Sequence, residues 1–188
     1  MKNKIISIFM VMCLCFLAVA CSEQSPNEDI KKITFYSEYL TFINSDPQKA
    51  INDFSDGNGC VSAYANEDGS ATVEFYESQW KGYIEDGEKI LEQTKNDFAD
   101  IQDGYAIEYQ DDYKTINFYY NLDLPAEDAI YNILKVEMIC CQLQIYNGAD
   151  ENSWKVTVNI YNSDTGKLVT TGNPDELGYT EEDWRASM

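Results

Sequence analysis

The acid with the most unusual setting in this sequence is Glu137, which stands on a strongly apolar predicted helix. At about 100° per residue, it falls on the same side of that helix as Ile130, Ile133, Leu134, Cys140 and Cys141. A carboxyl in apolar surroundings holds its proton more tightly, which is the property of a general acid. We favour a structural role, because buried acids are commonly satisfied by tyrosine, lysine or backbone donors and the chain contains 14 tyrosines.

A hydrolase built on Glu137 needs a second carboxylate at a defined distance, and 33 acidic residues offer no way to choose it. The chain has no histidine, which removes the usual general base, the usual zinc ligand and every imidazole triad. We therefore predict no catalytic residue and no cofactor. A histidine-free, carboxylate-dependent hydrolase of the cell envelope remains the alternative.

The cysteines and two loops with acidic residues are candidate metal or redox sites. Neither has the residue spacing that such a site requires. Cys60, Cys140 and Cys141 show no Cys-x-x-Cys spacing and have no histidine partners. Cys60 could pair with either member of the adjacent pair in an oxidising exterior, but we favour Cys140 and Cys141 as small core residues. The loops at 56–59 and 162–167 lack the alternating oxygen ligands of an EF-hand and are interpreted as turns, so we predict no metal.

The N-terminal residues predict export from the cytoplasm. Lys2 and Lys4 precede an apolar core, at 5–17, that is too short for a comfortable membrane span. Cys21 directly follows small residues and precedes a polar stretch. We predict a signal peptide at 1–20, lipidation of Cys21, and a flexible tether at 21–28 that holds the chain at the extracytoplasmic face of the cell membrane. Simple secretion after cleavage by ordinary signal peptidase is the other possibility.

Charge narrows the range of partners. The formal net charge is −20 at pH 7, and loss of Lys2 and Lys4 with the signal peptide makes the mature chain more acidic still. Such a surface repels nucleic acid and anionic lipid headgroups. We expect the protein to attach to the membrane through its lipid anchor and to bind no nucleic acid. Its partner is expected to be an unknown protein or glycan.

The elements that must position these residues are three hairpins and two helices. Alternating apolar and polar residues around turn residues predict hairpins at 61–76, 105–120 and 155–171. Helical spacing predicts a helix at 78–98 with Ser78 as its N-cap, and another from Pro125 to Asn147. The order β-β-α-β-β-α-β-β predicts an α+β fold in which both helices pack on one face of a single antiparallel sheet.

The remaining segments are less regular. A weaker helix or an irregular segment is expected at 29–54, so that 29–174 forms one α+β domain. The acidic tail at 175–188 is expected to be disordered.

The three hairpins share a pentapeptide, which starts at Thr72, Thr115 and Thr157. Period-2 alternation sends the second and fourth residues of each copy to the core and the others to the opposite face. If the three strands lie near one another, that face carries a candidate binding surface. Its members are Thr72, Glu74, Tyr76, Thr115, Asn117, Tyr119, Thr157, Asn159 and Tyr161. The simpler explanation is that threonine and tyrosine suit the solvated side of a sheet.

Three stretches carry a resemblance to a known group: the lipobox-like end at Cys21, "DGSATVEFYESQWKGYI" and "VTVNIYNSDTGKLV". With these features the chain resembles, over nearly all its length, small exported lipoproteins of unassigned function from anaerobic Gram-positive bacteria. The resemblance implies a location and a fold, and it brings no catalytic residues. We therefore expect a membrane-anchored extracytoplasmic module that binds a partner without catalysing a reaction, with a structural surface protein as a third possibility.

Overall fold

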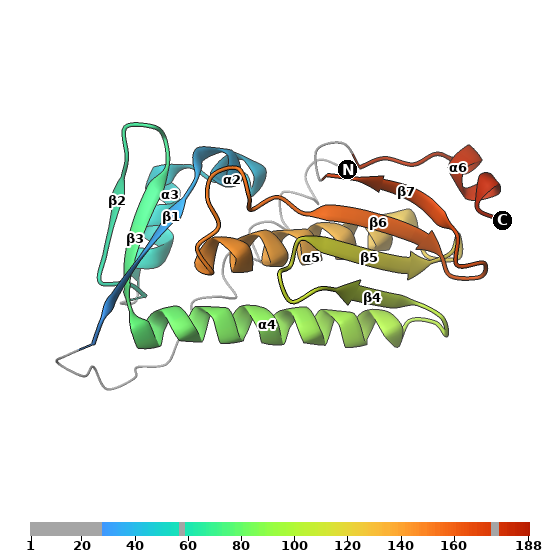
Figure 1. Ribbon diagram of the computed structural model, residues 1–188, viewed down its shortest axis with the longest axis horizontal. Coiled ribbons are helices and arrows are strands. Elements are labelled where there is room, and N and C mark those ends of the chain that lie inside the picture. Colours follow the sequence, from blue (N-terminus) through green and yellow to red (C-terminus); the bar gives the residue numbers. More distant parts are fainter. Residues whose placement is uncertain (1–27, 57–58, 174–176) are drawn as a thin grey trace. The chain divides into compact units, whose positions relative to one another are not determined.

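The computed structural model describes residues 28–56, 59–173 and 177–188. Cys21, the predicted signal peptide and most of the predicted tether lie outside these residues. Five helices and seven strands occur in the described part of the chain, which confirms the α+β class (Figure 1). None of these helices combines the length and the apolar character that crossing a bilayer requires. The chain divides into two compact units between Asp86 and Gly87, and each is described by itself.

The first unit contains a three-stranded antiparallel sheet, here called sheet A, in the order β1-β3-β2. The strands are β1 (Ile30–Phe35), β2 (Ser62–Ala65) and β3 (Ala71–Tyr76). The predicted hairpin of β2 and β3 is present, and Gly69 takes the positive φ of 83° that its tight turn requires. The expectation for 29–54 missed β1, whose short alternation of Ile33 and Phe35 with polar residues is a weak signal until β3 pairs with it.

Three helices accompany sheet A: α2 (Ser37–Phe42), α3 (Pro47–Ser55) and the first part of α4 (Glu77–Ala99). Asp46 caps α3 by accepting a hydrogen bond of 2.8 Å from the backbone nitrogen of Lys49. Aromatic rings form the centre of the unit, where Phe54 packs against Phe75 and Tyr83 with ring centroids 5.6 and 5.8 Å apart.

The prediction of Ser78 as the N-cap of α4 is wrong, because the helix already begins at Glu77. Ser78 lies inside the helix, and its backbone nitrogen donates to the carboxylate of Glu28 at 2.6 Å. Gln79 reaches back so that its Oε1 accepts a hydrogen bond of 2.9 Å from the backbone nitrogen of Tyr76. The carboxylate of Glu28, from the segment before β1, therefore satisfies one of the free backbone donors in the first turn of α4.

The second unit contains a four-stranded sheet, here called sheet B, in the order β4-β5-β6-β7. The strands are β4 (Ala106–Tyr109), β5 (Thr115–Tyr120), β6 (Thr157–Asn162) and β7 (Leu168–Gly172). Both predicted hairpins of this unit pair antiparallel, but β5 and β6 pair parallel. The predicted single antiparallel sheet is therefore wrong, because the helix between β5 and β6 returns the chain to the end from which β5 started.

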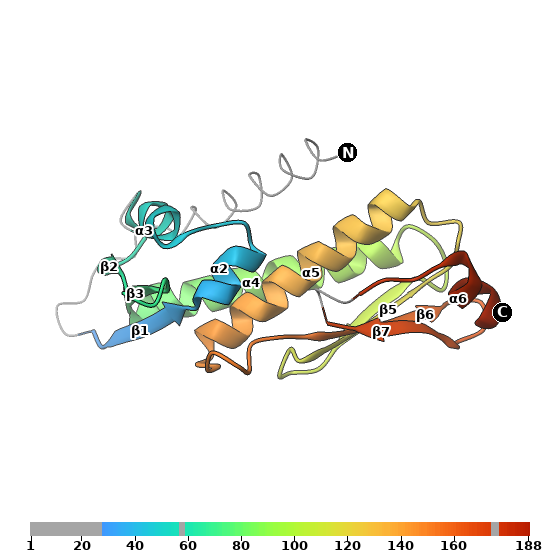
Figure 2. The same ribbon diagram turned by 90° about the horizontal axis from the view of Figure 1, so that it is seen from above.

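That helix is α5 (Ala126–Tyr146), which begins after Pro125 and ends before Asn147, as the sequence predicts. It runs along one side of β5, β6 and β7 (Figure 2). The residues that sheet B sends into the core are fully buried: Ile116, Phe118, Val158 and Ile160. Phe98, near the end of α4, packs edge-on against Phe118 with centroids 5.9 Å apart. Helices thus cover one face of sheet B, and its other face carries the polar residues.

The C-terminal residues form a short helix, α6 (Glu181–Ala186), which corrects the expectation of disorder. Thr180 and Asp183 form a capping box, and Trp184 is only 2% exposed. The indole of Trp184 lies against Tyr120, with ring centroids 5.3 Å apart. One buried tryptophan anchors a segment whose acidic composition alone suggests disorder.

Candidate functional site

The nine residues predicted to form one binding surface lie on two sheets. Thr72, Glu74 and Tyr76 belong to β3 of sheet A, whereas the other six belong to β5 and β6 of sheet B. The prediction of one continuous surface is wrong, because it assumed that all three hairpins join a single sheet. The structure brings six of the nine residues together and leaves three apart.

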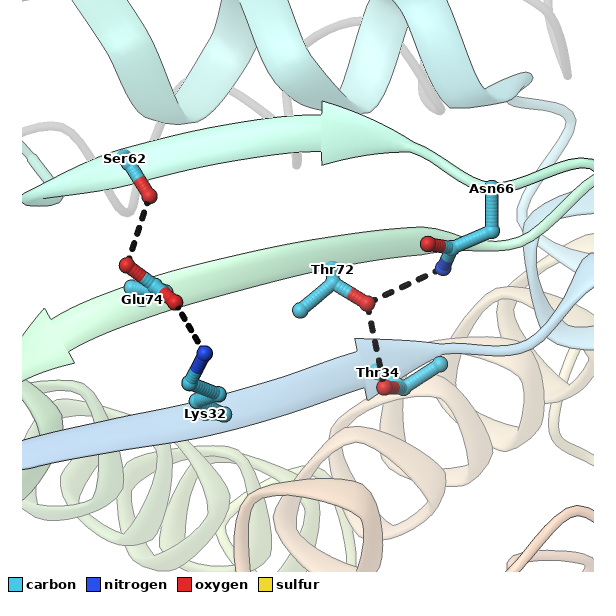
Figure 3. A network of polar contacts seen from close by, with 6 residues as sticks. All are labelled: Lys32, Thr34, Ser62, Asn66, Thr72 and Glu74. Atoms are coloured by element: carbon cyan, nitrogen blue, oxygen red, sulfur yellow. Dashed lines mark hydrogen bonds and ion pairs between the residues drawn. The ribbon is translucent and has the colours of Figure 1, made fainter.

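Two of the three residues on sheet A, Thr72 and Glu74, lie in a polar network that is largely satisfied internally (Figure 3). Glu74 pairs with Lys32 at 2.5 Å and accepts a hydrogen bond of 2.8 Å from Ser62. The Lys32 ammonium group is the main cause that lowers the pKa of Glu74, and the serine hydroxyl adds to it. Thr72 is only 7% exposed and accepts a hydrogen bond of 2.9 Å from Asn66. Side chains that already satisfy one another have little capacity left for a ligand.

The six residues on sheet B stand opposite one another in matched pairs. The parallel register joins Thr115 to Thr157, Asn117 to Asn159, and Tyr119 to Tyr161. The flanking strands extend these pairs into rows. The tyrosine row contains Ala106, Tyr119, Tyr161 and Leu168; the amide row contains Glu108, Asn117, Asn159 and Thr171; the threonine row contains Thr115 and Thr157. We call these ten residues the ladder face.

The amide row is a chain of hydrogen bonds across three strands. The Thr171 hydroxyl donates to Asn159 Oδ1 at 2.6 Å, and Asn159 Nδ2 donates to Asn117 Oδ1 at 2.9 Å. Each bond fixes the orientation of the next amide, so the groups point in one direction from β7 towards β4. The amide nitrogen of Asn117 stands at the end of this chain, and no acceptor among the described residues engages it.

The tyrosine row is held just as firmly. The rings of Tyr119 and Tyr161 stack with centroids 5.0 Å apart and an interplanar angle of 14°. The Tyr119 hydroxyl donates to Glu108 Oε2 at 3.1 Å, and partial burial followed by this carboxylate raises the pKa of Tyr119. Leu168, which is 48% exposed, lies opposite Tyr161 and gives the row an apolar end.

Several polar groups of the ladder face have no protein partner within the described residues. They are the hydroxyls of Thr115, Thr157 and Tyr161 and the amide nitrogen of Asn117. The ten residues include one carboxylate and no lysine or arginine. Hydrogen bonds fix the amide row and stacking fixes the tyrosine row, so the free groups of these two rows occupy set positions on a surface with a single charged side chain.

Sequence reasoning missed the four outer members of the ladder face. Ala106, Glu108, Leu168 and Thr171 are not part of the shared pentapeptides, and they join the face through pairing with β5 and β6. Hairpin register gives the signal for Glu108, because the turn at 110–114 sets it opposite Asn117. Leu168 carries no such signal, because the ladder shifts register between Ile160 and Tyr161.

The candidate acid Glu137 is sealed in the core of the second unit. It is 1% exposed, and Ile133, Cys140 and Cys141 on the same side of α5 are buried as well. Ile130 is 48% exposed, so its predicted place on the buried side is wrong. Burial and then the carboxylate of Glu137 raise the pKa of Cys140. The carboxyl of Glu137 therefore does not reach the surface of the second unit.

The cysteines described by the structure are free thiols: Cys60, Cys140 and Cys141. Cys140 and Cys141 are fully buried, which confirms that they are core residues. Burial raises the pKa of both thiols and so suppresses the reactive thiolate. Across the described ranges, no three histidine, cysteine or acidic side chains lie close enough together to hold a metal ion.

Comparison of the chain with protein-family models, with curated proteins and with solved structures found no match. The resemblance to small exported lipoproteins therefore stays a prediction, and the ladder face and the N-terminal residues are the features of the chain that bear on its function.

Proposed function

We propose that this protein is a lipid-anchored module of the extracytoplasmic membrane face and that it binds a partner through the ladder face without catalysing a reaction. The supporting observation is the ladder face itself, a rigid surface with free hydroxyl and amide groups on the side of sheet B opposite α5. Glu137, Cys140 and Cys141, the candidate reactive groups of α5, are buried in the core and are not part of this surface.

The anchor is argued from the sequence. Cys21 follows small residues and an apolar core, and it precedes a polar stretch that leads into Glu28 at the start of the described residues. A diacylglyceryl group on Cys21 would hold the protein at the membrane, and a second acyl chain would make that attachment stable.

The anchor is tested by expressing wild-type protein and a Cys21→Ser variant and by measuring each in the membrane fraction and in the medium. We expect the variant to move to the medium, with an unmodified N-terminal peptide by mass spectrometry. Membrane retention of the variant equal to that of wild type would refute the anchor.

Binding is tested by crosslinking in intact cells, followed by affinity capture of the full-length protein. A double variant, Tyr119→Ser with Tyr161→Ser, removes the stacked rings from the ladder face. The matched control is Tyr64→Ser, because Tyr64 is a 43% exposed tyrosine of sheet A. We expect the double variant to lose crosslinked material that wild type and the control retain. Identical material from all three folded proteins would refute a binding role for the ladder face.

A further inference from the structure

From the ladder face we infer that the partner is a neutral glycan. This inference rests on the proposed function and specifies the class of ligand that the ladder face binds. Three features of the ladder face favour such a ligand: its free hydrogen-bonding groups, its amphipathic tyrosine row, and the charge of the chain around it.

The free groups of the ladder face match sugar hydroxyls in kind. A sugar hydroxyl both donates and accepts, and so do the unpartnered hydroxyls of Thr115, Thr157 and Tyr161. The Asn117 amide supplies donors, and Glu108 keeps acceptor capacity beyond the bond from Tyr119. Because Asn159 and Thr171 fix the orientation of Asn117, binding needs little further ordering of side chains.

The tyrosine row supplies the apolar contact that a sugar also needs. Tyr119, Tyr161 and Leu168 place two stacked aromatic rings and a branched aliphatic group in the row next to the amide row. Tyrosine presents a rigid body that is apolar with a polar tip, which suits a ligand whose C–H and O–H groups alternate. With strands about 4.8 Å apart, a row across four strands is about 14 Å long, enough for a short oligosaccharide.

The pattern favours a glycan over a protein. The fully buried centre of a protein interface is depleted in charge and is built around large apolar or aromatic anchors in pockets. On the ladder face the central position belongs to the amide row, and the apolar groups lie to one side of it. A protein partner would have to desolvate these amides, whereas a sugar can replace their water with its own hydroxyls.

Charge selects a neutral glycan over an anionic one. The chain carries a formal net charge of −20, and the ladder face has no lysine or arginine to offset it. A polymer of phosphate or uronate groups would be repelled by this field, whereas an uncharged polysaccharide would not be.

The test is binding of purified full-length protein in detergent to immobilised hexasaccharides. The neutral probes are hexasaccharides of glucose, mannose, xylose or N-acetylglucosamine. The anionic probe is a hexasaccharide of galacturonate. The variants are Tyr161→Ala, which removes a partly exposed ring, and Asn117→Asp, which removes the free donor and adds a negative charge. Tyr64→Ala on sheet A is the matched control, and circular dichroism checks the folding of each variant.

We expect wild type to bind at least one neutral probe and not the galacturonate probe. Tyr161→Ala and Asn117→Asp should each bind about tenfold more weakly, and Tyr64→Ala should bind as wild type does. Binding of no neutral probe, preference for galacturonate, or equal binding by all variants would each overturn the glycan inference. If no probe binds while the crosslinking experiment still depends on the ladder face, the proposed function stands and the partner is of another class.

Discussion

Tyr109, Tyr113 and Tyr119 each donate a hydrogen bond to a glutamate, at 3.1, 2.9 and 3.1 Å. The acceptors are Glu92, Glu88 and Glu108. The chain has 33 acidic residues and only 13 lysines and arginines, so most carboxylates cannot find a cation. The tyrosine hydroxyl is a neutral hydrogen-bond donor on a rigid ring. In the second unit, tyrosines therefore donate hydrogen bonds to carboxylates, which the lysines and arginines are too few to pair.

A first prediction concerns Tyr83 at alkaline pH. Its hydroxyl donates to the carbonyl of Gly59 at 3.2 Å, and burial, followed by Cys60 and Asp86, raises the pKa of Tyr83 from 10.0 to about 12. The folded state keeps a proton that the unfolded state loses, so this contribution to stability is complete below pH 10 and is lost as pH rises towards 12. Urea denaturation of wild type should therefore show a falling free energy of unfolding over this interval.

The control is Tyr83→Phe, which keeps the ring and removes the ionisable group. We expect its free energy of unfolding to fall less steeply between pH 10 and pH 12. The same slope in both proteins would mean that Tyr83 ionises alike in the folded and unfolded states.

A second prediction concerns Glu137, which is 1% exposed on α5. Glu137→Gln keeps the shape and the hydrogen-bonding capacity of the side chain, so we expect the free energy of unfolding to change by no more than about 1 kcal/mol. Glu137→Ala leaves a cavity and should cost about 2–5 kcal/mol. Chemical denaturation measures both. A loss of more than about 3 kcal/mol in the glutamine variant would point to a broken ion pair in the core.

Among the elements, α6 gives the clearest prediction. Trp184 is 2% exposed against Tyr120, while the Thr165 hydroxyl holds the carbonyl of Ser187 at 2.6 Å. Trp184→Ala removes a large buried ring and should destabilise the protein by about 3–5 kcal/mol. Thermal denaturation checks the loss, and limited proteolysis should then cut first within 177–188. Asp183→Ala, which breaks only the capping box, should cost about 1 kcal/mol. Equal losses for both variants would contradict a role for the ring.

Elements that are determined by residues close together in the chain were predictable, and pairings between distant segments were not. The hairpins were predictable because their turns need particular residues, such as Gly69 with a φ of 83°. The ends of α5 were predictable because Pro125 and Gly148 lie at its boundaries. The pairing of β1 with β3 and of β5 with β6 depends on partners that no local pattern specifies, so the number of sheets was not predictable.

The ladder face illustrates the same limit at the level of a site. Alternation predicted which side chains of β5 and β6 leave the core, and these six residues do share a face. Alternation also led to the assignment of Thr72 to that face, which is wrong because Thr72 lies on sheet A. The alternation of residues along a strand does not indicate which sheet the strand joins. The anchoring of the tail by Trp184 was missed because composition averages away a single large side chain, although the capping box at Thr180 was present in the sequence.

For the molecule as a whole, net charge gives a fourth prediction. The formal net charge of −20 at pH 7 produces self-repulsion that opposes the compact state, and salt screens it. We expect the melting temperature to rise as sodium chloride is added at pH 7. The control is the same titration near the isoelectric point of about 4.1, where the net charge is close to zero and salt should have little effect. A rise of equal size at both pH values would show that screening of net charge is not the cause.

The parallel pairing of β5 with β6 also governs the order in which the second unit can assemble. The β4–β5 and β6–β7 hairpins close short loops, whereas pairing of β5 with β6 closes the whole segment that contains α5. The longer loop loses more conformational entropy before the contacts between β5 and β6 can offset that loss. Until then each hairpin has a bare inner edge of uncharged residues, which is a template for pairing with another chain. Repulsion between highly acidic chains opposes such encounters, so the charge that weakens the folded state also protects the protein while it folds.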